Sequence, residues 1–136
     1  MMPTHKNKHI LNPHTGTTIF GVVPQIEHPS YHFPEGEIIL RYGEHRGANR
    51  GWGLCHLWAE HAKQICSMGY ETEEDAARYV ADILESGSKI YCEFASMRNE
   101  RMAVLQSTFG SVIIEHRYYG DNTTFYSVVT AFNNKR

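Results

Sequence analysis

The stretch Val112-Ile113-Ile114-Glu115-His116-Arg117 alternates between two kinds of side chain, and this alternation decides the expected fold class. Val112 and Ile114 fall on one side of such a segment, while Glu115 and Arg117 fall on the other. A period of two residues is typical of a β-strand with one covered face. We therefore expect a strand here, with its apolar side against helices.

Other segments after Gly87 alternate in the same way, and they are residues 90–94, 102–106 and 126–132. Residues that favour turns separate the segments, at 98–100, 108–110 and 120–122. Short connections of this kind join antiparallel neighbours. The last four strands are therefore predicted to form an antiparallel meander.

Two helices are predicted before these strands. Leu54, Leu57 and Trp58 recur at helical spacing in the first of them. Thr72 is a good N-cap for the second, which ends before Ser86-Gly87-Ser88. The expected fold class is thus α+β: an N-terminal strand or arm, two helices, and then a four-stranded antiparallel sheet.

The first part of the chain has a different composition. All five prolines stand in residues 1–34, which excludes a long helix there. Residues 17–23 favour a short strand or an arm. A further strand is predicted at 37–42, so we expect an arm or extension over residues 1–35 and one domain over residues 36–136.

Length and composition limit the classes of protein to which the chain can belong. With 136 residues, 41% of them hydrophobic, it is long enough for one domain with a core. A net charge of −2 excludes a globally basic nucleic-acid binder, but not a basic cleft on a near-neutral body. No apolar run reaches the ~18–20 residues of a membrane span, and we expect no secretion signal and no membrane partner.

The cysteines and histidines bear on location and chemistry. Cys55, Cys66 and Cys92 form no CxxC pair and indicate free thiols in a reducing compartment, so a cytoplasmic location is expected. Nine histidines are many for this length. His56 and His61 lie in the first predicted helix, but five residues apart they stand roughly 140° from each other around its axis. A shared metal is therefore not expected.

The exposed face of the predicted sheet offers a second place for chemistry. Tyr126, Thr130 and Phe132 are predicted to project from it, and pairing of the last strands brings Arg117 near Tyr126 or Thr130. An arginine, a hydroxyl and an aromatic ring on one face can hold a phosphate and a stacked base. Ordinary cross-strand pairs on a solvated face are the alternative.

A loop is predicted at residues 43–51, between the first strand of the domain and the first helix. It carries Arg46 and Arg50, which we assign as candidate substrate-binding cations. The alternative is that these side chains are simply solvated, as charged residues on loops usually are.

The first helix and the residues before it resemble a known signature. The stretch Gly51-Trp52-Gly53-Leu54-Cys55-His56-Leu57-Trp58-Ala59-Glu60-His61 is similar to the pattern G-[FYW]-G-L-x-H-[IL]-x-x-x-H of phage and polymorphic-toxin nucleases. These are grouped as Barnase–EndoU–colicin–RelE-like (BECR) proteins. Residues 112–117 and 126–132 resemble the last two strands of that family, and the resemblance covers residues 36–136. It implies two helices followed by a curved antiparallel sheet that carries a cleft.

The resemblance also implies an activity: a metal-independent endoribonuclease toxin without a cofactor, which cleaves RNA by attack of its 2′-hydroxyl, with tRNA among the candidate substrates. It places the general acid and base at His56 and His61 and the cation that stabilises the phosphorane at Arg117. Thr130 would bind the phosphate or orient the 2′-hydroxyl. Tyr126 or Phe132 would stack a base. An immunity protein or antitoxin as partner, and RNA in a bacterial cytoplasm as target, are implied in the same way.

Two other classes of function stay open. A catalytically inert module on the same scaffold would bind RNA or protein without turnover. An ADP-ribosyltransferase is the third candidate, but the Arg, Ser/Thr and Glu elements of that family do not occur here in the order it requires.

Overall fold

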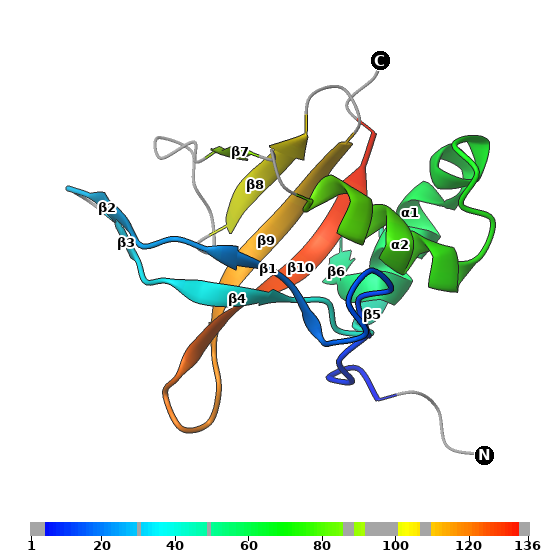
Figure 1. Ribbon diagram of the computed structural model, residues 1–136. Coiled ribbons are helices and arrows are strands. Elements are labelled where there is room, and N and C mark those ends of the chain that lie inside the picture. Colours follow the sequence, from blue (N-terminus) through cyan, green and yellow to red (C-terminus); the bar gives the residue numbers. More distant parts are fainter. Residues whose placement is uncertain are drawn as a thin grey trace.

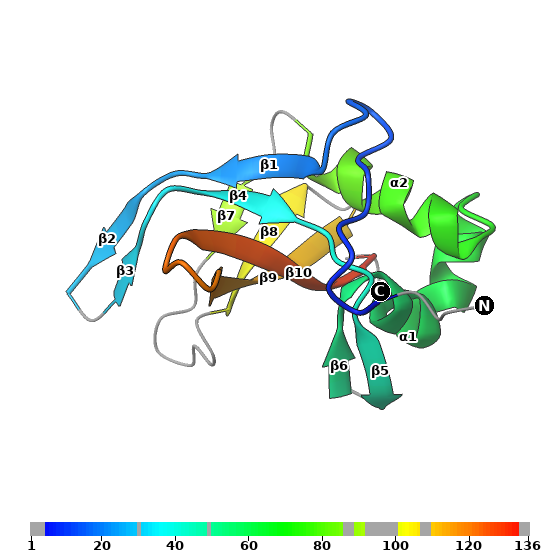
Figure 2. The same cartoon turned by 90° about the horizontal axis from the view of Figure 1, so that it is seen from below.

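The computed structural model describes residues 5–29, 31–48, 50–85, 89–91, 101–106 and 110–133 (Figure 1). Within these residues the fold is α+β, with the helices α1 (Gly53–Ser67) and α2 (Glu73–Ile83) beside a mixed sheet. The sheet has the strand order β1-β4-β10-β9-β8-β7. Its strands are β1 (Ile19–Val23), β4 (Gly36–Ile39), β7 (Lys89–Tyr91), β8 (Arg101–Gln106), β9 (Gly110–Tyr118) and β10 (Thr124–Phe132). Two hairpins project from this body (Figure 2), β2 (Ile26–His28) with β3 (Tyr31–Phe33) and β5 (Glu44–Gly47) with β6 (Arg50–Trp52).

The last four strands form the predicted antiparallel meander, because β7 pairs with β8, β8 with β9, and β9 with β10, each antiparallel. The prediction of a wholly antiparallel sheet is wrong. β4 lies parallel to β10, with Ile38 opposite Tyr126 and Ile39 opposite Ser127. The sequence at residues 37–42 predicts a strand but does not identify the strand with which it pairs. The predicted loop at residues 43–51 is also replaced by the β5–β6 hairpin.

Residues before Gly36 contribute to the same sheet and core as those after it. β1 pairs antiparallel with β4, in agreement with the strand expected at residues 17–23. Phe20, Val23 and Phe33 are buried in the central core cluster. The core lies between the two helices and one face of the sheet. The cysteine Cys92, the residue Phe94 and the expected turns at 98–100 and 108–109 lie outside the described residues.

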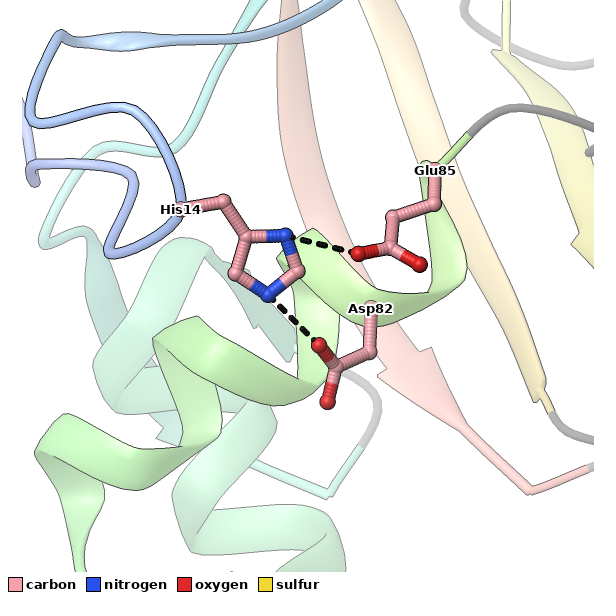
Figure 3. A group of neighbouring side chains, drawn as sticks. All are labelled: His14, Asp82 and Glu85. Carbon is pink, nitrogen blue, oxygen red and sulfur yellow. Dashed lines mark ion pairs between the residues drawn. The ribbon is translucent and has the colours of Figure 1, made fainter.

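One contact ties the N-terminal segment to the end of α2 (Figure 3). The His14 ring lies between two carboxylates: its Nε2 is 2.7 Å from Asp82 Oδ1, and its Nδ1 is 2.9 Å from Glu85 Oε1. Tyr70 donates its hydroxyl hydrogen to the other oxygen of Asp82. Hydrogen bonds to ionised groups are among the stronger ones, so this cluster fixes the segment before β1 against the helices.

Helix α2 begins where the sequence predicts. Thr72 is its N-cap, and Thr72 Oγ1 accepts a hydrogen bond from the backbone N–H of Asp75 at 3.1 Å. Three acidic residues in the first turn interact favourably with the helix dipole. Apolar residues at helical spacing then bury one face of α2, including Tyr79, Val80 and Ile83.

A β-bulge in β10 changes which side chains face outward. Val128 pairs with Ile114, but the next pair is Thr130 with Ile113, so Val129 is an extra residue on β10. Side chains of antiparallel partners project to the same side of a sheet. We call the side away from the core the outer face, and it carries Phe125, Ser127, Thr130 and Phe132 of β10 with Ser111, Ile113, Glu115 and Arg117 of β9.

The prediction that Tyr126 projects from this face is wrong. Tyr126 is fully buried in the core and donates its hydroxyl hydrogen to the carbonyl oxygen of Pro34 at 2.7 Å. Strict alternation places Tyr126 and Thr130 on one side, whereas the extra residue between them puts them on opposite sides. The outward positions of Thr130 and Arg117, by contrast, agree with the prediction.

Candidate active site

A cavity of about 380 Å³ lies where α1, the β5–β6 hairpin and the outer face of the sheet meet. Its walls are formed by Gly51, His56, Glu60, His61, Ile113, Val129, Thr130 and Phe132. The structure thus brings together both predicted histidines, the predicted hydroxyl and one of the two predicted aromatic rings. Cavities that combine apolar walls with a few converging polar groups are the usual place for small-molecule or substrate binding.

His56 is buried and held on both sides of its ring. Its Nε2 is 3.2 Å from Glu60 Oε1, one helical turn along α1, and its Nδ1 is 2.9 Å from His45 Nδ1 on the hairpin. If His56 is neutral and donates from Nε2 to Glu60, its Nδ1 accepts the N–H of His45. Gly51 permits this close packing, because a Cβ there would lie 2.6 Å from His56 Nδ1.

His45 and Glu60 were not predicted as site residues. The spacing of Glu60, four residues after His56, is a signal from which the contact could have been inferred. His45 carried no such signal, because residues 43–51 were predicted as a loop without a partner. The hairpin that places His45 against His56 results from pairing of β5 with β6.

His61 is half-buried and contacts Phe132, with the two ring centroids 5.7 Å apart. It makes no hydrogen bond to any residue that the structure describes. Burial lowers its pKa, and the nearby negative charge of Glu60 opposes this shift more weakly. The His61 imidazole is therefore mostly neutral at pH 7, and its basic nitrogen is able to accept a proton.

Thr130 presents an unsatisfied polar atom. Its Oγ1 is buried and has no hydrogen-bond partner within the described ranges. A buried hydroxyl without a partner costs about 1–3 kcal/mol, so a ligand that bonds to it recovers this free energy. The bulge at Val129 places this hydroxyl on the cavity side of β10.

The predicted cations do not line the cavity. Arg117 lies further along the outer face, where its Nη1 is 3.0 Å from Glu115 Oε1. Arg46 is exposed on the β5–β6 hairpin and pairs with Glu44 at 3.1 Å. Arg50 is exposed on the same hairpin, next to the cavity residue Gly51. None of the three arginines is therefore among the residues that form the walls of the cavity.

A further cation, Arg41, was not predicted as a site residue. It follows β4, and its Nε donates to Ser127 Oγ on the outer face at 2.9 Å. Its guanidinium lies 4.0 Å above the Trp52 ring and 5.2 Å from the Phe125 ring. These contacts depend on the parallel pairing of β4 with β10, which the sequence alone did not reveal.

Two other places on the molecule have features of a binding site. His14, Asp82 and Glu85 carry ligand atoms within 4.8 Å of one another and are of the residue types that bind metal ions (Figure 3). Each nitrogen of His14 already has a carboxylate partner there. A larger cavity of about 490 Å³ lies between the N-terminal segment and the start of α2, with mainly apolar walls. Neither place contains a residue assigned to the site from the sequence.

Replacement of Tyr126 by phenylalanine is expected to lower the free energy of unfolding by about 1 kcal/mol, because the bond to the Pro34 carbonyl is lost. The ring itself stays in the core, so no other contact of the side chain is removed. Denaturant unfolding of the variant and of the unaltered protein measures the difference. Equal stability of the two would show that this hydrogen bond does not contribute to folding.

The cavity combines three groups that can take part in a reaction. They are the neutral imidazole of His61, the imidazole of His56 between Glu60 and His45, and the Thr130 hydroxyl, which lacks a partner among the described residues. Such a set is able to move protons to and from a bound substrate and to donate a hydrogen bond to an anionic oxygen.

No helix within the described ranges has the length and apolar character needed to cross a membrane. In comparisons with protein-family models, curated proteins and solved structures, the chain matches none of them.

Proposed function

We propose that the protein is an endoribonuclease that cleaves RNA by attack of a 2′-hydroxyl on the adjacent phosphate, with the cavity as its active site. The observation that carries this proposal is the meeting of His61 with the unpaired Thr130 hydroxyl in one cavity that His56 also lines. Attack by a 2′-hydroxyl needs a group that removes its proton and another that protonates the leaving 5′-oxygen. Two imidazoles are able to fill both roles near neutral pH.

We assign the roles from the contacts of each residue. His61 accepts the proton of the 2′-hydroxyl, because its lowered pKa keeps it neutral and no described residue occupies its nitrogens. His56, positioned by Glu60 and His45, enters the step as the imidazolium and gives one proton to the leaving 5′-oxygen, so that it ends neutral while His61 ends protonated. Thr130 donates its hydroxyl hydrogen to a phosphate oxygen. None of these steps needs a metal ion or a cofactor.

The biological setting is proposed from the sequence signature. The stretch 51–61 resembles that of BECR nucleases, and two helices followed by the meander β7–β10 agree with the arrangement expected for them. On this basis we propose a toxin that acts on RNA, tRNA included, in a bacterial cytoplasm. An immunity protein or antitoxin would then be its partner.

The activity is tested directly by incubating the purified protein with total tRNA in excess EDTA. We expect cleavage with 2′,3′-cyclic phosphate ends, since the attacking oxygen stays bonded to phosphorus. An RNA with a single 2′-deoxy nucleotide at the mapped cut site should resist cleavage there. Intact tRNA after prolonged incubation, together with several other RNAs left intact, would contradict the proposal.

An inert binding module is the alternative that one observation favours. Both ring nitrogens of His56 have protein partners, so this residue must exchange one of them to reach a substrate. The same assay separates the two functions, because the inert module would bind RNA or protein without any product appearing.

A further inference from the structure

The guanidinium of Arg41 is half-buried and lacks a carboxylate partner among the described residues. Its contacts are with neutral groups: the Ser127 hydroxyl, the Asn7 side-chain carbonyl at 3.0 Å, and the rings of Trp52 and Phe125. Burial lowers the pKa of Arg41 to about 10, which leaves it charged at pH 7. Charges removed from water are normally paired in proteins, so the missing partner of Arg41 requires an explanation.

A second positive charge lies close to Arg41. Beside burial, repulsion by the positive charge of Arg117 lowers the pKa of Arg41. Glu115 carries the negative charge beside them, and it is paired with Arg117 at 3.0 Å. The two guanidinium groups therefore share Glu115, and the carboxylates of Glu37 and Asp121 act on the neighbouring Tyr119 rather than pairing with Arg41.

The orientation of Arg41 leaves donors available. A guanidinium has five N–H groups, and Arg41 uses Nε toward Ser127 and one N–H of Nη1 toward Asn7. The remaining donors on Nη1 and Nη2 bond to none of the described residues. Contact with the Trp52 ring holds the plane of the group in place, so a ligand need not order it. A planar fork of this kind matches two oxygens of a phosphate.

From this arrangement we propose that Arg41 and Arg117 form a phosphate subsite on the outer face, which binds the backbone of an RNA strand beside the cavity. Ser127, which anchors Arg41, and Thr130, which lines the cavity, stand on the same strand and the same face. At ~3.3 Å per residue they are at most about 10 Å apart. A strand with one phosphate at Thr130 thus places a neighbouring phosphate over Arg41. The RNA identity of the ligand rests on the proposed function, whereas the anion site does not.

Aromatic rings continue the subsite beyond the arginines. Tyr119 stacks on Phe125 with ring centroids 4.3 Å apart, and it is 38% exposed at the end of β9. An exposed ring next to cations is the usual surface on which single-stranded nucleic acids stack their bases. The strand is therefore expected to run from the cavity over Arg41 toward Tyr119.

The test is binding of a short 2′-O-methyl RNA oligonucleotide, which cannot supply the attacking hydroxyl, measured by fluorescence anisotropy. We expect Arg41→Gln to weaken binding about tenfold, as loss of a charge-assisted hydrogen bond does. The affinity of Arg41→Lys should lie between those of the unaltered protein and of Arg41→Gln, since lysine keeps the positive charge but lacks the planar fork of N–H donors. The slope of log K against log salt should decrease in magnitude by about 0.7 for each phosphate contact removed.

Arg117→Gln serves as a second variant in case Arg41→Gln disturbs folding. The Arg117 side chain is exposed, so its replacement should leave the fold intact and still weaken oligonucleotide binding severalfold. The matched control is Arg78→Gln on α2, where an exposed arginine also stacks on an aromatic ring, that of Tyr70. It should bind like the unaltered protein. Equal affinity of the Arg41 and Arg117 variants and the unaltered protein would overturn the subsite, as would absence of oligonucleotide binding altogether.

The two proposals fail in different ways. If the arginine variants bind the oligonucleotide less tightly but the unaltered protein cuts no RNA, the subsite stands and the nuclease proposal is wrong. If the protein cuts RNA and the arginine variants bind and cut as well as it does, the subsite is wrong and the nuclease proposal stands.

Discussion

Replacing His61 with alanine is expected to lower the rate of RNA cleavage by about 10²–10⁴-fold, the range typical of a general base. The loss should come from chemistry rather than from folding. His61 is half-buried, and its ring contacts that of Phe132. Initial rates on one RNA substrate, together with thermal melting of both proteins, measure the two quantities separately.

The pH dependence of the cleavage rate is a second test of His61 as the general base. A general base works when deprotonated, so the rate rises with pH through the pKa of His61. Burial lowers that pKa below its ordinary value, so activity should persist to lower pH than a solvent-exposed imidazole would allow. The His61→Ala variant should lose this acidic limb.

His14→Ala is the matched control, since His14 is paired with Asp82 and Glu85 and does not line the cavity. Its cleavage rate should stay within about twofold of the unaltered protein, well under the effect of removing a general base. If His61→Ala cleaved RNA as fast as this control, the assignment of His61 as the base would be withdrawn.

Replacing Gly43 with alanine is expected to destabilise the protein by about 4 kcal/mol or more, which few single substitutions do. Gly43 has a φ of +81°, and a Cβ built on it would lie 1.8 Å from the carbonyl oxygen of Trp52 and 2.8 Å from the Cα of Gly53. Both are backbone atoms, so no side-chain rotation relieves the contact. The start of α1, and the rings and cations near it, would have to move.

Gly16 provides the control for the Gly43 variant. Its φ of +74° is similar, but nothing lies within 4 Å of a Cβ built there. Alanine at this position should cost only the left-handed backbone penalty, about 1–2 kcal/mol. Denaturant unfolding of both variants isolates the effect of close backbone packing. Equal stability of the two would show that Gly43 and Trp52 are less closely packed than this structure has them.

The parts of the fold that sequence predicts well are those set by local patterns. The cap at Thr72, the apolar face of α2 and the alternation in β9 all arise from residues a few positions apart. The parallel pairing of β4 with β10 joins residues about ninety positions apart, such as Ile38 and Tyr126, and no local pattern encodes it. The β5–β6 hairpin was missed because Glu44–Gly47 lacks the apolar alternation of a half-buried strand.

The candidate site likewise contains some residues that local patterns predict and others that depend on pairing between distant strands. His56, His61, Thr130 and Phe132 were chosen from a helix signature and a strand pattern, and the structure gathers them around one cavity. Arg41 could not be selected, because its position over Trp52 and Ser127 results from pairing between distant strands. Tyr126 was placed on the wrong side of the sheet because an extra residue interrupts an otherwise regular alternation.

The single extra residue at Val129 determines which side chains of β10 line the cavity. In an uninterrupted strand, Thr130 and Phe132 would turn into the hydrophobic interior and Ala131 would take their place outside. The Thr130 hydroxyl would then be buried among aliphatic side chains of the core, and the part of β10 nearest the histidines of α1 would carry no polar side chain. An irregularity that weakens the hydrogen-bond ladder by one step is thus what converts a structural strand into one that presents reactive groups.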